Sequence, residues 1–130
     1  MLVIASLAVG GVLAVVVNFP SSPCSKTPGV TSHFTIVADV SGFNGSRYQP
    51  GSWPIITVHA CDTVFITIVN SDTQTHGFAV EYYASNGVEV QGRQSQTVQF
   101  VAGRTGQFRM FCNVFCTVHI FMQNGLLSTT

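Results

Sequence analysis

Charged side chains are scarce in this 130-residue chain, where they make up 8% of the residues and divide into five basic and five acidic ones. An ordinary soluble domain has about 25%. The basic residues are scattered, so the sequence lacks the basic stripe that nucleic-acid binding requires. It also offers no two neighbouring carboxylates of the glycosidase type. A membrane-embedded partner, or an extracytoplasmic face at a low pH that titrates carboxylates, accounts for so little charge.

Hydrophobic residues are abundant, at 46% of the chain, which excludes a disordered protein. The length fits one domain. The longest apolar run, LVIASLAVGGVLAVVV, covers residues 2–17 and contains nothing more polar than Ser6. A helix of this length spans roughly 24 Å at about 1.5 Å per residue, slightly less than a bilayer core of about 30 Å.

This apolar run has two interpretations, a retained membrane anchor or a cleaved signal peptide. A signal peptide has a basic segment before the apolar run and a small-x-small cleavage site after it, and the sequence shows neither. We therefore expect a transmembrane helix over residues 1–19. Proline, glycine, serine and threonine are frequent in residues 20–32, which is typical of a linker. The folded domain is then expected over residues 33–130.

The remainder of the chain predicts β-strands. Apolar residues alternate with polar ones in the segments 34–40, 62–70, 97–100 and 107–112, and many are β-branched or aromatic. Turn-forming residues separate these segments, and no sustained helical period follows residue 20. Short strands with regular turns in about 100 residues indicate an all-β sandwich.

The segment Cys112-Asn-Val-Phe-Cys116-Thr-Val-His119-Ile-Phe-Met122 contains the chemically informative residues. Two thiols, an imidazole and a thioether fall within eleven residues. Thiolate and thioether ligands together with imidazole favour copper, and a dedicated zinc site rarely uses methionine. One more ligand is needed, and His76, which follows a polar turn, can supply it if the fold brings it close.

From about His33 to the C-terminus, the sequence resembles the CuA domain of subunit II of haem-copper (cytochrome c) oxidases. The resemblance includes Tyr48-Gln-Pro, His76-Gly-Phe-Ala-Val-Glu and Gly106-Gln-Phe-Arg ahead of the cysteines. It implies an all-β, cupredoxin-like Greek-key β-sandwich, here preceded by one N-terminal transmembrane helix. In that family, Cys-x3-Cys-x3-His-x2-Met and an upstream histidine hold two copper ions.

The resemblance also implies a ligand set for a dinuclear copper centre. Two thiolates would bridge the two ions, each ion would take one imidazole, and a thioether and a backbone carbonyl would complete the two sites. Carried over residue by residue, these ligands are Cys112 and Cys116 (bridging), His76 and His119 (imidazoles), Met122 (thioether) and Val114 (carbonyl).

One departure from the family pattern keeps an alternative open. Only two residues separate Cys116 from His119, so the loop is one residue short. The Cys-x2-His-x2-Met spacing is similar to that of amicyanin-type blue copper proteins. The alternative is a single type 1 copper bound by His76, Cys116, His119 and Met122, which leaves Cys112 without a role.

The CuA resemblance implies a function in electron transfer, without an organic substrate. The chain would not be catalytic alone. It would be the electron-entry subunit of a membrane respiratory terminal oxidase, single-pass and with its copper domain on the extracytoplasmic side. A soluble donor, cytochrome c or a blue copper protein, would deliver electrons, and haem in subunit I, held with other membrane subunits, would accept them. A membrane-tethered blue copper carrier and a copper-delivery or structural subunit are the alternatives.

Several residues have a structural interpretation beside the functional one. Cys112 and Cys116 would form a disulfide in an oxidised, metal-free chain. Cys24 and Cys61 are either a disulfide or two free thiols. No ligand partner lies in register with His33 or His59, so both are expected to be structural. Four phenylalanines are candidates for an apolar shell around the copper centre: Phe78, Phe111, Phe115 and Phe121.

Overall fold

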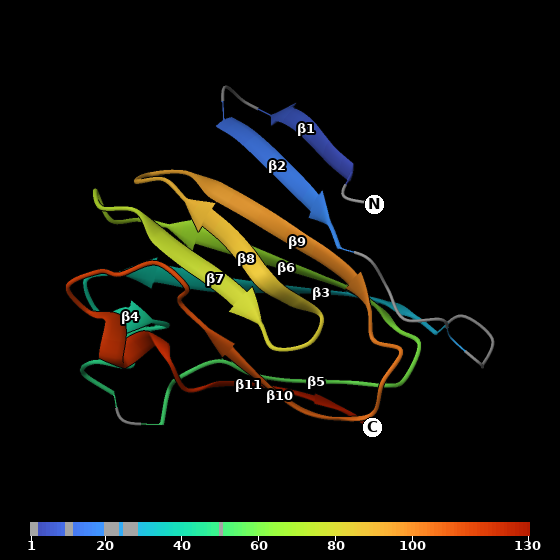
Figure 1. Cartoon of the computed structure of the whole chain (residues 1–130). Coiled ribbons are helices and arrows are strands. Elements are labelled where there is room, and N and C mark those ends of the chain that lie inside the picture. The colour runs from blue at the N-terminus through green and yellow to red at the C-terminus, as the bar shows by residue number, and fades with distance from the viewer. Residues whose placement is uncertain (1–2, 10–11, 20–23, 25–28, 50) are drawn as a thin grey trace.

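The computed structural model describes residues 3–9, 12–19, 24, 29–49 and 51–130. Within these residues the chain forms strands β1 to β11 and one short 3-10 helix, η1 (His119–Met122), and the strands make two facing sheets (Figure 1). The first sheet contains six strands, which are, in order across the sheet, β1 (Val3–Val9), β2 (Val12–Asn18), β9 (Ser95–Val101), β6 (Thr63–Asn70), β3 (Thr31–Asp39) and β4 (Gly42–Phe43). The second sheet contains five strands, which are, in order, β5 (Ile55–Val58), β11 (Gly125–Thr129), β10 (Gly106–Phe111), β7 (His76–Val80) and β8 (Ala84–Val90). The expected all-β sandwich is confirmed.

The core lies between the two sheets and follows the period-two pattern of the sequence. In β6, every second side chain is buried, including Val64, Ile66 and Ile68, and the side chains between them are partly exposed. Successive side chains of a strand point to opposite faces, so alternation places one apolar row inside. Phe43 of β4 and Phe78 of β7 meet edge to face across the sandwich, with ring centroids 6.0 Å apart. This contact packs β4 against the middle of β7.

The N-terminal segment differs from the expected transmembrane helix. Val3–Val9 and Val12–Asn18 are antiparallel strands, and β2 also pairs in parallel with β9, from Ala14 opposite Ser95 to Asn18 opposite Gln99. Valine and isoleucine are frequent in both strands, and their branched Cβ favours extended backbone. The apolar run is long enough for a helix, but its β-branched content favours strands. Among the described residues, no helix has the length and apolar character needed to cross a bilayer.

The division of the chain at residues 19 and 32 stays a prediction. Residues 20–23 and 25–28 of the expected linker lie outside the described residues. The described Cys24 forms a disulfide with Cys61, with the two Cα atoms 5.7 Å apart. This bond ties the segment before β3 to the turn before β6. The sequence left open whether these cysteines form a disulfide or are two free thiols, and the structure shows the disulfide. Such bonds are typical of an oxidising, extracytoplasmic compartment.

Replacing Cys24 and Cys61 together by serine is expected to lower the free energy of unfolding by about 2–4 kcal/mol. The bond joins residues 37 apart in sequence, so its loss frees a long loop in the unfolded chain. Urea unfolding of the metal-free chain measures the change. The single Cys24→Ser variant is the control and should lose the same amount, and an unchanged unfolding midpoint would contradict a stabilising crosslink.

Candidate metal centre

Two antiparallel strands bring the upstream histidine to the cysteine loop. His76 opens β7 and Cys112 follows the last residue of β10, and the pairing of Phe111 with Ala79 runs the two strands in opposite directions. The chain beyond β10 therefore reaches the start of β7. The backbone N–H of Gly77 donates a hydrogen bond to Cys112 Sγ over 3.3 Å. The expected proximity of His76 and Cys112 is thus observed.

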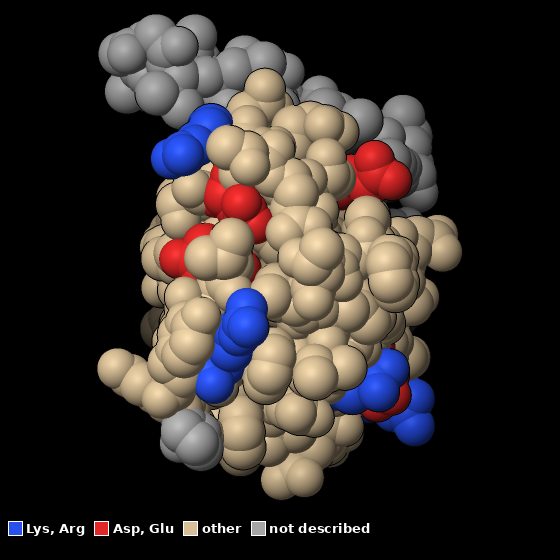
Figure 2. All heavy atoms as spheres, turned by 90° about the vertical axis from the view of Figure 1, so that its left-hand side faces the viewer, with Lys and Arg blue, Asp and Glu red and all other residues tan. Residues whose placement is uncertain are grey.

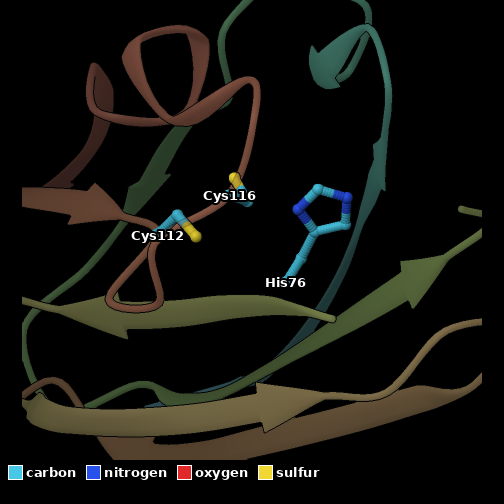
Figure 3. A group of neighbouring side chains, drawn as sticks. All are labelled: His76, Cys112 and Cys116. Carbon is cyan, nitrogen blue, oxygen red and sulfur yellow. The ribbon is translucent and has the colours of Figure 1, made fainter. Parts of the chain in front are cut away.

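His76, Cys112 and Cys116 form a compact, buried group. One donor atom from each lies within 4.8 Å of the other two, and the three residues are at most 5% exposed. Figure 3 shows the two sulfur atoms and the imidazole ring pointing toward one another. His76 Nε2–H donates to Asp72 Oδ2 over 2.9 Å, and Nδ1 is buried without a hydrogen-bond partner. A buried nitrogen left open beside two thiols is a ready metal ligand.

Met122 and Cys116 approach each other across the cysteine loop. The thioether Sδ lies 3.7 Å from Cys116 Sγ, and Met122 is fully buried. The loop closes because the N–H of Cys112 donates to the carbonyl of Met122 over 2.7 Å. Helix η1 carries Met122 inward and leaves Ile120 exposed. The thioether therefore belongs to the same cluster as the two thiols.

His119 lies beside a different part of the loop. Its Nδ1 is 3.1 Å from the carbonyl oxygen of Val114, and Cys112 Sγ–H donates to the same oxygen over 3.0 Å. The donors therefore adjoin one another around the two thiols. His76, Cys112 and Cys116 form one cluster, Met122 contacts Cys116, and the Val114 carbonyl contacts both Cys112 and His119. All six residues predicted from the sequence lie in this one region.

The donor set fits copper. Two ligands that bind one ion at about 2.0–2.3 Å with a tetrahedral angle have donor atoms roughly 3.3–3.8 Å apart. The 3.7 Å contact between Cys116 Sγ and Met122 Sδ is of this size, and the contacts of Cys112 Sγ and His119 Nδ1 with the Val114 carbonyl, at 3.0 and 3.1 Å, are slightly shorter. Thiolate, thioether and imidazole donors together are typical of copper. The open Nδ1 of His76 adds a buried donor without a partner in the metal-free chain.

Protonation of the cluster is set by burial and by short contacts. Burial raises the pKa of Asp72, but hydrogen bonds from His76, Gln74 and Thr73 outweigh burial, so the pKa of Asp72 is lowered. Burial lowers the pKa of His76, but contacts with Cys112 and Asp72 outweigh it, so the pKa of His76 is raised. An imidazole held between a carboxylate and a thiol is stabilised in its charged form.

The two thiols have very different acidities. Burial raises the pKa of Cys112, but His76 and the N–H of Gly77 outweigh burial and bring this pKa to about 7. Burial and the neighbouring Cys112 raise the pKa of Cys116 to about 11. Cys112 therefore loses its proton first.

The absorbance of the metal-free, reduced chain at 240 nm is expected to show one thiolate forming with a midpoint near pH 7. The His76→Asn variant should move this midpoint upward, because the imidazole that stabilises the Cys112 thiolate is gone. His59→Asn is the matched control, since His59 is exposed and bonds Thr130 instead. A wild-type midpoint above pH 8.5 would contradict the proposed acidity.

Residues that the sequence did not single out hold the loop in place. Asp72 orients His76, and the only sequence signal for it is a carboxylate four residues before a histidine. Ser46 Oγ–H donates to the carbonyl of Phe121 in η1 over 2.6 Å. Gly42 has a φ of 84°, and a Cβ at this position would lie 2.7 Å from the same carbonyl oxygen. β4 and the turn after it therefore pack against η1, beside which β4 is seen in Figure 1.

The structure agrees with some of the remaining expectations about individual side chains and differs from others. His33 stacks on Phe65 with ring centroids 4.7 Å apart, and His59 hydrogen-bonds Thr130, which agrees with structural roles for both histidines. Phe78 is buried and Phe121 packs against the core. Phe115 is 90% exposed, so it does not enclose the centre as expected. Its ring stacks on that of His119 with centroids 6.1 Å apart, so it lies at the rim of the centre.

Comparisons with known proteins agree on the fold. No family model and no curated protein matches the chain. A chain of a haem-copper terminal oxidase dimer, solved by cryo-electron microscopy, matches with a TM-score of 0.62 and 18% identity over 86% of this chain and 72% of that one. Auracyanin from Roseiflexus castenholzii matches with a TM-score of 0.59 and 13% identity over 78% of this chain and 99% of that one.

Larger copper enzymes also contain this fold. A copper nitrite reductase from Nitrosomonas europaea matches with a TM-score of 0.59 and 19% identity over 76% of this chain. This chain spans 41% of that enzyme's chain and 39% of the chain of a multicopper oxidase. The resemblance expected from the sequence is therefore confirmed at the level of the fold, and the chain is a cupredoxin-like β-sandwich.

Proposed function

We propose that this chain is a copper electron-transfer protein with a dinuclear centre of the CuA type. The observation that carries the proposal is the position of Cys112. Its thiol lies in the same buried group as His76 and Cys116 and also contacts the Val114 carbonyl. A single type 1 copper has no use for this second thiol.

The resemblance to CuA domains gives each residue a role. Cys112 and Cys116 would be shared between the two ions. His76 and Met122 would complete one site, and His119 with the Val114 carbonyl would complete the other. Bound copper would supply a one-electron couple whose charge is spread over both ions and both sulfur atoms.

The protein contributes rigidity and exclusion of water. β7 and β10 fix His76 and Cys112 in paired strands, and the Asp72 carboxylate holds the His76 ring so that Nδ1 faces the thiols. Full burial of His76 and Met122 keeps water away from one half of the centre. A donor set that moves little between redox states keeps electron transfer fast.

The proposed physiological role is electron entry into a haem-copper terminal oxidase. Its support is the match to a haem-copper oxidase chain, of which this chain covers 72%, together with the His76-Gly-Phe-Ala-Val-Glu and cysteine motifs. In this role the chain would receive electrons from a soluble donor and pass them to haem in the catalytic subunit. The chain would not be catalytic by itself.

A membrane-tethered blue copper carrier is the second candidate. The two-residue spacing between Cys116 and His119 favours it, as does auracyanin, whose chain is covered to 99%. Under this candidate, His76, Cys116, His119 and Met122 hold one ion, and Cys112 is dispensable. The two candidates therefore differ in the number of ions bound and in the need for Cys112.

The end of the sandwich that carries η1 is a nearly neutral surface. Phe115 and Ile120 are 90% and 72% exposed on the metal-binding loop. Figure 2 faces this end and shows charged side chains separated by broad uncharged areas. We propose that the electron donor docks here through apolar contacts.

Electron transfer from a soluble donor to the copper-loaded chain is expected to change little with ionic strength. Steering by charge makes association fall steeply with salt, and this end of the molecule has few charges to steer with. Stopped-flow rates between about 20 mM and 300 mM salt test the electron-transfer function directly, because surface charges are screened weakly at the lower concentration and strongly at the higher one. Phe115→Ser should slow the reaction at every salt concentration, while Val30→Ser, which is exposed next to β3 instead, is the control. A steep fall with salt, or no reduction at all, would contradict the proposal.

Although residues 3–9 and 12–18 form strands β1 and β2, we propose that the apolar segment 1–19 attaches the chain to a membrane, with the sandwich on the extracytoplasmic side. The support is the uncharged run in residues 2–17 and the disulfide between Cys24 and Cys61. Fractionation of cells that express the full chain tests it. Recovery of the chain in the soluble fraction would contradict membrane attachment.

A further inference from the structure

Gln123, the residue after Met122, joins two arms of the cysteine loop. Its amide nitrogen lies 3.1 Å from the carbonyl oxygen of Cys112 and 3.0 Å from Nε2 of His119. The side chain is half-buried and directly follows η1. The same amide therefore contacts the backbone of one proposed ligand and the imidazole of another.

The hydrogen positions in this network follow from the chemistry of its members. The carbonyl of Cys112 only accepts, so the amide presents its NH2 group there. The second amide hydrogen points to His119 Nε2, which must then accept. A neutral imidazole that accepts at Nε2 carries its hydrogen on Nδ1. This Nδ1–H has its acceptor in the Val114 carbonyl, 3.1 Å away.

The metal-free network therefore holds His119 in the form that does not ligate through Nδ1. Ligation at Nδ1 needs the hydrogen on Nε2 instead, so Nδ1 gives its hydrogen to water and Nε2 gains one from water. Nε2–H then faces an amide NH2, donor against donor. The conflict ends when the Gln123 amide turns so that its Oε1 accepts from Nε2–H of His119. This turn breaks the hydrogen bond between the amide and the carbonyl of Cys112.

We propose that Gln123 is a positioning residue of the copper centre: it sets the tautomer of His119 in the metal-free chain and turns its amide when His119 becomes a ligand. The second half of this proposal rests on the proposed function. A groove of about 520 Å³, lined by Gln123 together with Trp53, Arg109 and Asn124, gives the amide room to turn. Partners that accept the outer N–H of a ligating histidine raise its basicity and typically contribute 10–100-fold to metal affinity.

Nitrogen-15 spectra of the histidine rings in the metal-free, reduced chain test the first half. At a fixed pH near 8, His119 is expected as the Nδ1–H tautomer in the wild type. Gln123→Met, which is similar in length but has no amide, should weaken this preference to what the Val114 carbonyl alone supports, and Gln123→Glu, which only accepts, should invert it to Nε2–H. Gln107→Met, on the exposed start of β10, is the control and should match the wild type. An Nε2–H tautomer in the wild type, or a Gln123→Met spectrum equal to the control, would overturn the proposal.

Titration with copper(I) tests the second half. Gln123→Met should bind copper 10–100-fold more weakly than the wild type, and Gln123→Glu should bind at least as tightly as the wild type, because its carboxylate accepts from Nε2–H. Equal affinities for Gln123→Met and the control would overturn the turning of the amide. A wild-type chain that takes up no copper would overturn the proposed function and this half together, while the metal-free spectra would still decide whether Gln123 sets the tautomer.

Discussion

A chain with serine in place of Cys112 is expected to hold at most one copper ion and to lose the mixed-valence signal of the wild type. The thiol of Cys112 contacts the Val114 carbonyl over 3.0 Å and lies in the same cluster as His76 and Cys116. A serine hydroxyl has nearly the same shape but is a poor ligand for copper(I), which selects soft sulfur. Copper analysis and the visible spectrum of the loaded variant measure the loss.

Cys116→Ser is the matched variant for this experiment. Both substitutions should destroy a dinuclear centre, since both thiols are shared. A single type 1 copper would survive Cys112→Ser with its blue colour intact and would be lost only with Cys116→Ser. That asymmetric pattern would contradict the dinuclear proposal and favour the blue copper carrier.

Replacement of Asp72 by asparagine is expected to weaken copper binding 10–100-fold. The carboxylate is 8% exposed and accepts the Nε2–H of His76 over 2.9 Å, which keeps Nδ1 aimed at the thiols. Asparagine keeps the shape but removes the charge that makes the His76 ring more basic. Competition with a copper(I) chelator measures the affinity. Glu81→Gln, at the far end of β7, is the control, and equal affinities for the two variants would contradict a role for Asp72.

The same substitution should also change the pH dependence of the metal-free chain. The pKa of Asp72 is lowered in the fold, so its contribution is lost as pH falls below the ordinary value of 3.8 and through the lowered pKa. The pKa of His76 is raised, so its contribution is complete below the ordinary value of 6.5 and is lost as pH rises through the raised pKa. The pair therefore stabilises most between these two values.

Urea unfolding at pH 5.5 should then show the largest difference between wild type and Asp72→Asn, of about 1.5–3 kcal/mol for a hydrogen bond between charged groups. The difference should shrink at pH 3 and at pH 9. A difference that stays constant across this range would show that the pair is not charged in the folded chain.

Periodicity predicted the strands but not the whole arrangement of the sandwich. The alternation of Val64, Ile66 and Ile68 places β6 correctly, because a strand buries one face and the sequence shows which residues belong to it. The apolar segment 2–17 satisfied the length rule for a membrane helix, yet the structure extends it beside β9. Pairing with a strand about eighty residues away is a tertiary effect, which local pattern does not contain.

The proposed ligand residues could be named from the sequence because their spacing carries chemistry, whereas the residues that support them could not. Cys112, Cys116, His119 and Met122 lie within one short segment whose donor types indicate copper. Asp72, Ser46 and Gln123 are ordinary polar residues whose roles appear only when the fold brings them to His76, Phe121 and His119. The cysteine pair 24 and 61 likewise needed the fold to establish its proximity.

The number of copper ions per chain, counted together with the electron paramagnetic resonance spectrum of the oxidised protein, tests the central claim most directly. Two coppers that share one unpaired electron give a multi-line copper hyperfine pattern, and this is the predicted result. One copper per chain with four-line splitting would contradict the dinuclear centre. A protein prepared with both thiols reduced that binds no copper would contradict the copper function altogether.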